Sequence, residues 1–200
     1  MTLFSIQQQY SFLRLCDAWH LVYYIPSNQD HTIYSSMLLK FKNNDKNIVN
    51  KWCQWTSNEL GSQENKFDYI VRALGSSELQ PSGLKGLDTL GYYLEERHGW
   101  AYVPSTLKKL EITPPMHTLK TLKERKEVIN ESYSVDNFSN NLNQKSILII
   151  DDVTTTNVTI SEILRALRVE WPYGRYFLFC LGKTNYNPES NALIGQNYFN

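Results

Sequence analysis

The sequence predicts an α/β fold in which a parallel sheet has helices on both faces and a helical segment covers the N-terminal part. Two observations predict the core. Residues 147–150 form a continuous apolar run without polar alternation, which is typical of a central parallel strand buried on both faces. An apolar stripe at helical spacing follows from about Val158, and another apolar run spans residues 176–181. Strand, helix and strand with short joins imply a right-handed crossover and therefore parallel strands.

The N-terminal third shows helical spacing rather than strand alternation. Residues 3–22 place apolar side chains at helical intervals, and a second helix is expected over residues 45–61. Residues 33–42 are short and mostly apolar, so the pattern leaves helix and strand open there. We therefore expect residues 1–65 to form a helical N-terminal cover and residues 66–200 to form the α/β core of the same folding unit.

Strand and helix patterns alternate in the next part of the chain. Residues 67–74 contain an extended apolar stretch that stops at a Gly-Ser-Ser turn, which predicts a strand that runs into a polar loop. Leucines at helical spacing predict a helix over residues 84–98, and a basic last turn followed by Gly99 supports this end. Short strands are expected at residues 101–103 and 133–135.

Composition and charge exclude several classes of function. The chain has 200 residues, of which 42% are hydrophobic, so it can bury a core of ordinary size. Twenty basic residues balance twenty acidic ones, so no overall field recruits nucleic acid, and we do not expect nucleic acid as a direct ligand. No apolar run approaches the ~20 residues of a membrane helix. The three cysteines form no CxxC pair, so we expect reduced thiols in a soluble, cytoplasmic protein, with neither a disulfide framework nor a zinc site.

Two adjacent acids, Asp151 and Asp152, end the buried apolar run. Burial of carboxylates costs several kcal/mol unless another group offsets it. Hydroxyl groups of a sugar or a hydrated divalent cation would do so, and Mg²⁺ prefers one or two carboxylates together with substrate phosphates. The acid pair therefore indicates a site for a sugar, for Mg²⁺, or for both.

A hydroxyl-rich turn follows the two acids and opens onto the predicted helix. Free backbone N–H groups and the positive end of the helix dipole favour a phosphate there, and threonine hydroxyls add hydrogen bonds. Together with the acids, the turn indicates a ligand with ribose hydroxyls on one side and a phosphate nearby, which is a ribose 5-phosphate. Ordinary capping of the helix is the alternative that the residues alone leave open. The residues expected to contact the phosphate are Thr154, Thr155, Thr156, Asn157, Val158 and Thr159.

The run from residue 147 to residue 159 resembles the motif by which type I phosphoribosyltransferases bind 5-phosphoribosyl-1-pyrophosphate (PRPP). Four apolar residues, two acids and a Thr-rich loop that closes in Thr159 all match the motif. Asn157 stands where the family usually has Gly. Because Asn is the residue that best tolerates the left-handed region after Gly, we expect the loop shape to survive with a side chain beside the phosphate pocket.

A second stretch resembles the family's first core strand and the loop that receives pyrophosphate. A Gly-Ser-Ser sequence alone indicates only a turn. The resemblance is supported by its position before a predicted helix and upstream of the acid pair. The resemblance implies that this loop contacts the pyrophosphate of PRPP. The residues concerned are Arg72, Ala73, Leu74, Gly75 and Ser76.

Residues 107–135 resemble the mobile-loop region of ComF-type proteins, a competence-associated branch of the same family. The stretch is rich in Lys and Arg, which are most often solvated surface residues. The resemblance instead implies a loop that closes over the site, and we expect Arg125 to offset charge on the departing pyrophosphate, because Glu124-Arg125 falls where the branch has a similar pair. The four-cysteine zinc module of that branch is absent from this sequence.

The resemblance implies a Mg²⁺-dependent transfer of a ribosyl 5-phosphate group from PRPP to a nitrogen nucleophile, with release of pyrophosphate. Asp151, Asp152 and Arg125 would be the catalytic residues, and the two acids would also hold Mg²⁺. No sequence pattern identifies the acceptor, which would be a nucleobase or another amine. The sequence also does not decide whether the protein forms a homodimer. The alternative is a non-catalytic sensor of PRPP or a nucleotide on the same fold, with a role in regulation, competence or DNA handling. A different phosphate-binding protein is disfavoured, because neither GxxxxGK[ST] nor a GxGxxG after a strand occurs.

Overall fold

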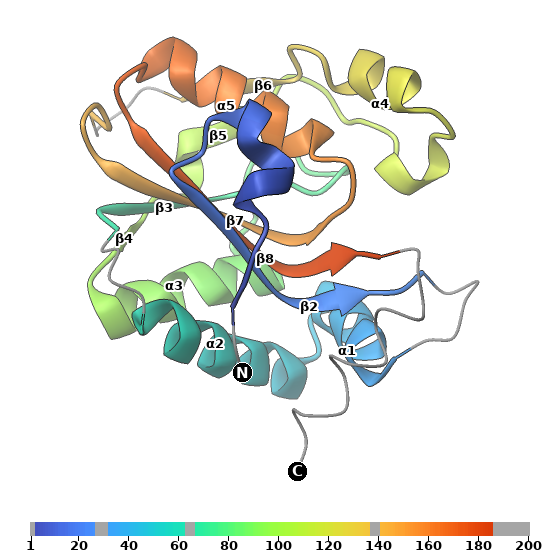
Figure 1. Cartoon of the computed structure of the whole chain (residues 1–200), viewed down its shortest axis with the longest axis vertical. Helices are drawn as coiled ribbons and strands as arrows, with labels where there is room; N and C mark the ends of the chain where they lie inside the picture. The colour runs from blue at the N-terminus through green and yellow to red at the C-terminus, as the bar shows by residue number, and fades with distance from the viewer. Residues whose placement is uncertain (1–2, 27–31, 63–66, 137–140, 186–200) are drawn as a thin grey trace.

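A six-stranded sheet forms the centre of the molecule (Figure 1). The computed structural model describes residues 3–26, 32–62, 67–136 and 141–185. β1 pairs antiparallel with β2 at one edge, and all the other neighbouring strands are parallel. The predicted α/β class with a parallel sheet is therefore confirmed. In spatial order, the strands are β1 (Phe4–Ser5), β2 (Asp17–Tyr24), β8 (Arg175–Thr184), β7 (Ser146–Thr154), β3 (Tyr69–Arg72) and β4 (Ala101–Tyr102).

Helices cover both faces of this sheet, as predicted. Figure 1 shows α1 (Ile33–Lys42), α2 (Lys46–Gly61) and α3 (Gly86–His98) on one face and α5 (Val158–Glu170) on the other. Alternate residues of β7 belong to two separate hydrophobic clusters: Ile147 and Ile149 to the cluster on the α5 side, Leu148 and Ile150 to the cluster on the other side. All four side chains are fully buried, which explains why this strand lacks polar alternation.

The expected helix over residues 3–22 is wrong. The chain there forms a 3-10 helix, η1 (Gln7–Leu13), and then enters the sheet as β2, which lies between β1 and β8. Residues 18–22 of this strand are all buried, so both faces of this part of the strand accept apolar side chains. A strand of that kind has no period of two, and the apolar positions match a helical spacing by chance.

The described part of residues 1–65 contributes two helices, α1 and α2, and also the strands β1 and β2 of the central sheet. Thr32 caps α1 by accepting a hydrogen bond from the Ser35 N–H, which settles the ambiguity of that segment in favour of a helix. Asp45 caps the predicted second helix in the same way. The expected boundary of the cover, at residues 65 and 66, and the end of the predicted core, residues 186–200, lie outside the described residues.

The helix α3 begins at Gly86 and ends as predicted. Gly99 follows it with a φ of 72°, the left-handed conformation that a helix end of this type requires. The two short strands predicted near residues 101 and 133 are also present, the first as β4 and the second as β6 (Tyr133–Val135).

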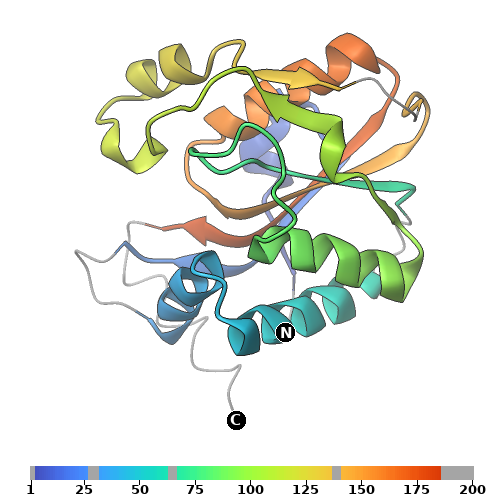
Figure 2. The same cartoon turned by 180° about the vertical axis from the view of Figure 1, so that it is seen from behind.

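The basic stretch forms a separate hairpin-like excursion. β6 pairs antiparallel with β5 (Leu107–Lys109), and between them lie the short 3-10 helix η3 (Met116–Thr118) and α4 (Leu122–Ile129). Figure 2 shows this excursion on the same side of the sheet as α5. A further 3-10 turn, η2 (Pro104–Thr106), connects β4 to β5. Among the described helices, none is long and apolar enough to span a membrane.

Candidate functional site

A cavity of about 850 Å³ lies at the carboxyl ends of β3 and β7. These strands are parallel neighbours with Arg72 opposite Ile150, so the loops that follow them leave the sheet at the same edge. Every residue that the sequence predicted for the site lines this cavity. They are Arg72, Ala73, Leu74, Gly75, Ser76, Arg125, Asp151, Asp152, Thr154, Thr155, Thr156, Asn157, Val158 and Thr159.

The two acids lie in the last part of β7 rather than after it, because the strand continues to Thr154. Burial, followed by repulsion from Asp152, raises the pKa of Asp151 to about 7. Lys42, at the end of α1, has its Nζ 3.4 Å from Asp152 Oδ1 and partly opposes this effect. The acid pair is thus only partly neutralised by the protein, which suits a ligand that brings hydroxyl donors or a cation.

The donor set at this position fits Mg²⁺. No group of three or more His, Cys, Asp or Glu residues that could hold a metal occurs in the part of the chain that the structure describes. Mg²⁺ does not require such a cage, since it keeps several waters and takes other ligands from substrate phosphates. Asp151 and Asp152 are the residues that would hold it.

The loop between β7 and α5 is built around Asn157. Its φ is 60°, the left-handed conformation, and its side chain is buried. Its Oδ1 accepts a hydrogen bond of 2.6 Å from the hydroxyl of Thr154, and it does not cap the N–H groups of α5. Simple capping by this residue therefore does not explain the loop. Thr155 and Thr156 are exposed beside the first turn of α5, where a phosphate would meet them.

Arg72 lies at the cavity, but its side chain is almost fully buried and its guanidinium is bound by neighbouring groups of the protein. Its guanidinium donates to both oxygens of Asp88 at 2.5 and 3.1 Å, to both oxygens of Glu78 at 3.0 and 2.9 Å, and to the Ala73 carbonyl at 3.0 Å. All five N–H groups of an arginine are thereby used. Arg72 consequently shapes the loop of residues 73–78, and its guanidinium has no N–H group left for a ligand in this arrangement.

Arg125 lies at the cavity wall, with its Nε and Nη2 donating to the Leu119 carbonyl at 3.1 and 3.0 Å. A second basic residue of the excursion, Lys109, is more buried than Arg125, with only 6% of its surface exposed. Its Nζ donates to the Gly75 carbonyl at 2.9 Å and to the Thr113 hydroxyl at 3.2 Å, and burial lowers its pKa to about 8. Sequence reasoning missed Lys109, although the short strand pattern places it on the same face as the buried Leu107.

One wall of the cavity comes from the N-terminal part of the chain. Tyr24 at the end of β2, Pro26 after it, and Leu39 and Lys42 of α1 all contribute to the lining. This wall could not be foreseen, because the strand that positions Tyr24 was expected to be a helix. This wall is next to the acid pair, because its residue Lys42 forms an ion pair with Asp152.

A scan against models of protein families and a search of curated proteins find no match for this chain. Among solved structures, the chain is similar to an adenine phosphoribosyl transferase from Trypanosoma brucei in complex with AMP, pyrophosphate and ribose-5-phosphate. The TM-score is 0.46 at 10% identity, over 94% of this chain and 90% of that chain. A hypothetical protein from Neisseria gonorrhoeae with bound ppGpp gives a TM-score of 0.38 at 11% identity, over 76% of this chain and 93% of that chain. Sequence identities this low leave the residues of the site to be judged by their own geometry.

Proposed function

We propose that the cavity binds the ribose 5-phosphate moiety of PRPP and that the chain is a Mg²⁺-dependent phosphoribosyltransferase related to the ComF-like branch. One observation supports this most strongly. A partly compensated acid pair and a hydroxyl-rich loop follow one another at the end of β7 and face the same cavity. The acids can accept from the ribose hydroxyls, while the loop can donate to the 5-phosphate.

The proposed reaction is a displacement at C1 of the ribose. The C1–O bond to pyrophosphate breaks, a C1–N bond to the acceptor forms, and the proton of the nitrogen passes to Asp152 or to water. Thr155, Thr156 and Thr159 hold the phosphate, and Asp151 and Asp152 favour the positive charge that develops on the ring. Bound Mg²⁺ would supply charge neutralisation for the leaving pyrophosphate. We propose that the acceptor enters along the wall formed by Tyr24, Leu39 and Lys42, beside the acid pair.

A non-catalytic sensor of PRPP or a nucleotide is the second candidate. It is favoured by the saturation of Arg72, because the guanidinium beside the Gly75 loop has no donor left to stabilise the charge that develops on a departing pyrophosphate. The two candidates share the ribose 5-phosphate site and differ only in what happens at C1.

Release of pyrophosphate from PRPP separates them. The protein is incubated with PRPP and MgCl₂ in the presence of a panel of nucleobases and simple amines, and pyrophosphate is measured by a coupled assay. Release that depends on one class of acceptor, and that falls by about 100-fold or more in Asp152→Asn, supports the transferase. The exposed carboxylate of Glu96 gives a matched control, Glu96→Gln, which should retain full activity. PRPP that binds but is not consumed with any acceptor supports the sensor.

A further inference from the structure

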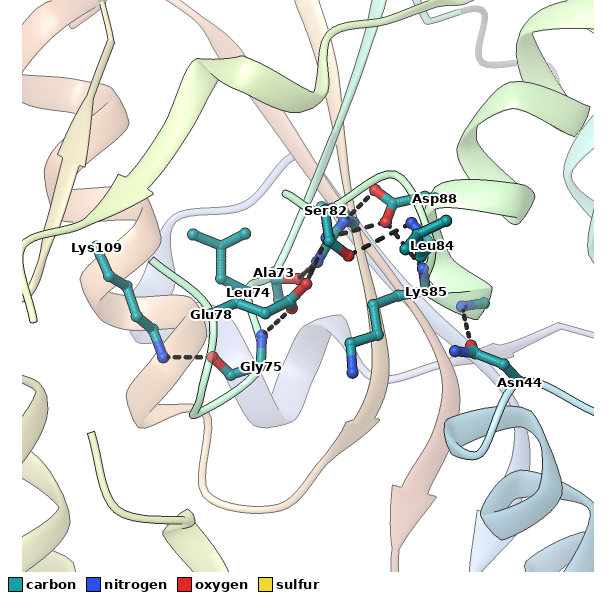
Figure 3. Close-up of polar contacts among 12 residues, drawn as sticks. Asn44, Ala73, Leu74, Gly75, Glu78, Ser82, Leu84, Lys85, Asp88 and Lys109 are labelled. Atoms are coloured by element: carbon teal, nitrogen blue, oxygen red, sulfur yellow. Dashed lines mark hydrogen bonds and ion pairs between the residues drawn. The ribbon is translucent and has the colours of Figure 1, made fainter. Parts of the chain in front are cut away.

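The carboxylate of Glu78 lies inside the turn that follows β3. Its Oε2 accepts a hydrogen bond of 2.7 Å from the Gly75 N–H, while its own N–H donates to the Gly75 carbonyl at 3.1 Å. Only 8% of the residue is exposed. Figure 3 shows Glu78 between Gly75 on one side and Asp88 on the other. An internal anion therefore takes one backbone donor of this loop, the Gly75 N–H.

The same carboxylate takes two N–H groups of Arg72. Nη1 donates to Oε2 at 3.0 Å and Nη2 donates to Oε1 at 2.9 Å, a two-pronged contact of the kind that arginine makes with phosphate. Burial raises the pKa of Glu78, but the hydrogen bonds from Arg72 and Gly75 and the charge of Lys85 outweigh burial and lower it overall. Glu78 is thus an anion at neutral pH, held as a bound phosphate oxygen would be held.

Gly75 is fitted to this carboxylate. A Cβ added at Gly75 would lie 3.1 Å from Glu78 Oε2, closer than an ordinary van der Waals contact, so the absence of a side chain lets the backbone approach the anion. From the opposite side, Lys109 Nζ donates to the Gly75 carbonyl and fixes the orientation of the peptide (Figure 3). The conformation of this loop therefore depends on the Glu78 carboxylate.

Gly75, Ser76, Ser77 and Glu78 all line the cavity that also contains the acid pair and the threonine loop. We propose that Glu78 is a specificity-determining residue that competes with the pyrophosphate group of a ligand for Arg72 and Gly75, so that this group adds less to binding than the 5-phosphate at the threonine loop. A pyrophosphate must displace Glu78 from Arg72 and Gly75 before it can use their donors. The inference rests on the proposed ribose 5-phosphate site and names which phosphorylated ligands that site prefers.

The substitution Glu78→Gln tests this inference, because it keeps the shape of the side chain and removes its charge. Arg72 keeps its ion pair with Asp88, so the guanidinium is not left without a partner. Wild type, Glu78→Gln, Glu78→Ala and the control Glu96→Gln are titrated by calorimetry with ribose 5-phosphate, with inorganic pyrophosphate and with PRPP, in MgCl₂. Thermal unfolding of each variant establishes that it is folded.

We expect Glu78→Gln and Glu78→Ala to bind pyrophosphate and PRPP about tenfold more tightly than wild type, because a competing anion is gone. Affinity for ribose 5-phosphate should change by less than about twofold, since that group lies at the other loop. Unchanged or weaker binding of pyrophosphate by both variants, which is the result if Glu78 holds the loop ready for pyrophosphate, overturns the inference. Failure of the wild type to bind ribose 5-phosphate would instead overturn the proposed function, and the pyrophosphate titration would still decide the role of Glu78.

Discussion

The hydroxyl of Thr154 donates a hydrogen bond of 2.6 Å to the side-chain oxygen of Asn157, and both residues are buried. This contact turns the Asn157 side chain back toward β7. It also holds in place a residue whose φ of 60° is costly for most side chains. The Asn157 side chain therefore helps to hold the conformation of this loop.

Replacement of Asn157 by Gly should loosen the loop. The φ stays accessible, but the hydrogen bond is lost and the unfolded chain gains freedom, so we expect about 1 kcal/mol of destabilisation and a few-fold weaker binding of ribose 5-phosphate. Urea denaturation of Asn157→Gly, Thr154→Val and the double variant measures the coupling between the two residues. A coupling energy near zero, or a large gain of activity in Asn157→Gly, would contradict this account.

Lys42 should compete with Mg²⁺ for the acid pair. Its Nζ lies 3.4 Å from Asp152 Oδ1, and although burial lowers the pKa of Lys42, attraction to Asp152 and then to Asp151 raises it overall, so it is charged at neutral pH. We expect Lys42→Met to tighten Mg²⁺ binding a few-fold in calorimetric titrations without PRPP, because a resident cation is removed. Lys40→Met is the matched control, since Lys40 lies exposed on the same helix. Weaker Mg²⁺ binding in Lys42→Met would show that Lys42 organises the acids instead.

Acid should destabilise the fold partly through His20. The residue is fully buried, and burial lowers its pKa from 6.5 to about 4, with Lys183 adding to the effect and the Val22 carbonyl opposing it. The unfolded chain therefore takes up this proton first as the pH falls, so stability is lost between pH 6.5 and about 4. The loss from this group is at most about 3 kcal/mol. Denaturation at several pH values should show a smaller loss over that window for His20→Gln than for wild type, and parallel profiles would refute the assignment.

The strand and loop that line the cavity could be predicted from the sequence because their signals are local. The apolar run of β7, the two acids and the turn before α5 follow one another in the chain, and each has a direct physical reading. β2 escaped detection because a strand buried on both faces has no alternation to distinguish it from a helix. Because β2 was not predicted, the place of Tyr24 in the cavity wall could not be predicted either.

The partners of Arg72 could not be predicted for a different reason. Glu78 and Asp88 lie 6 and 16 residues away, and only the folded turn and the start of α3 bring their carboxylates to one guanidinium. An arginine beside a Gly-Ser-Ser turn looks the same in sequence whether its side chain faces a ligand or two buried acids. The burial of Lys109 could not be predicted for the same reason, because a stretch rich in Lys and Arg does not indicate which of its residues is buried.

Calorimetric titration of the protein with PRPP, with and without Mg²⁺, tests the central claim most directly when it is run beside the double variant Asp151→Asn/Asp152→Asn. The account predicts Mg²⁺-dependent binding by the wild type that the double variant loses, because the acids hold both the ribose and the cation. Absence of PRPP binding to the folded wild type, or equal binding by the double variant, would contradict it.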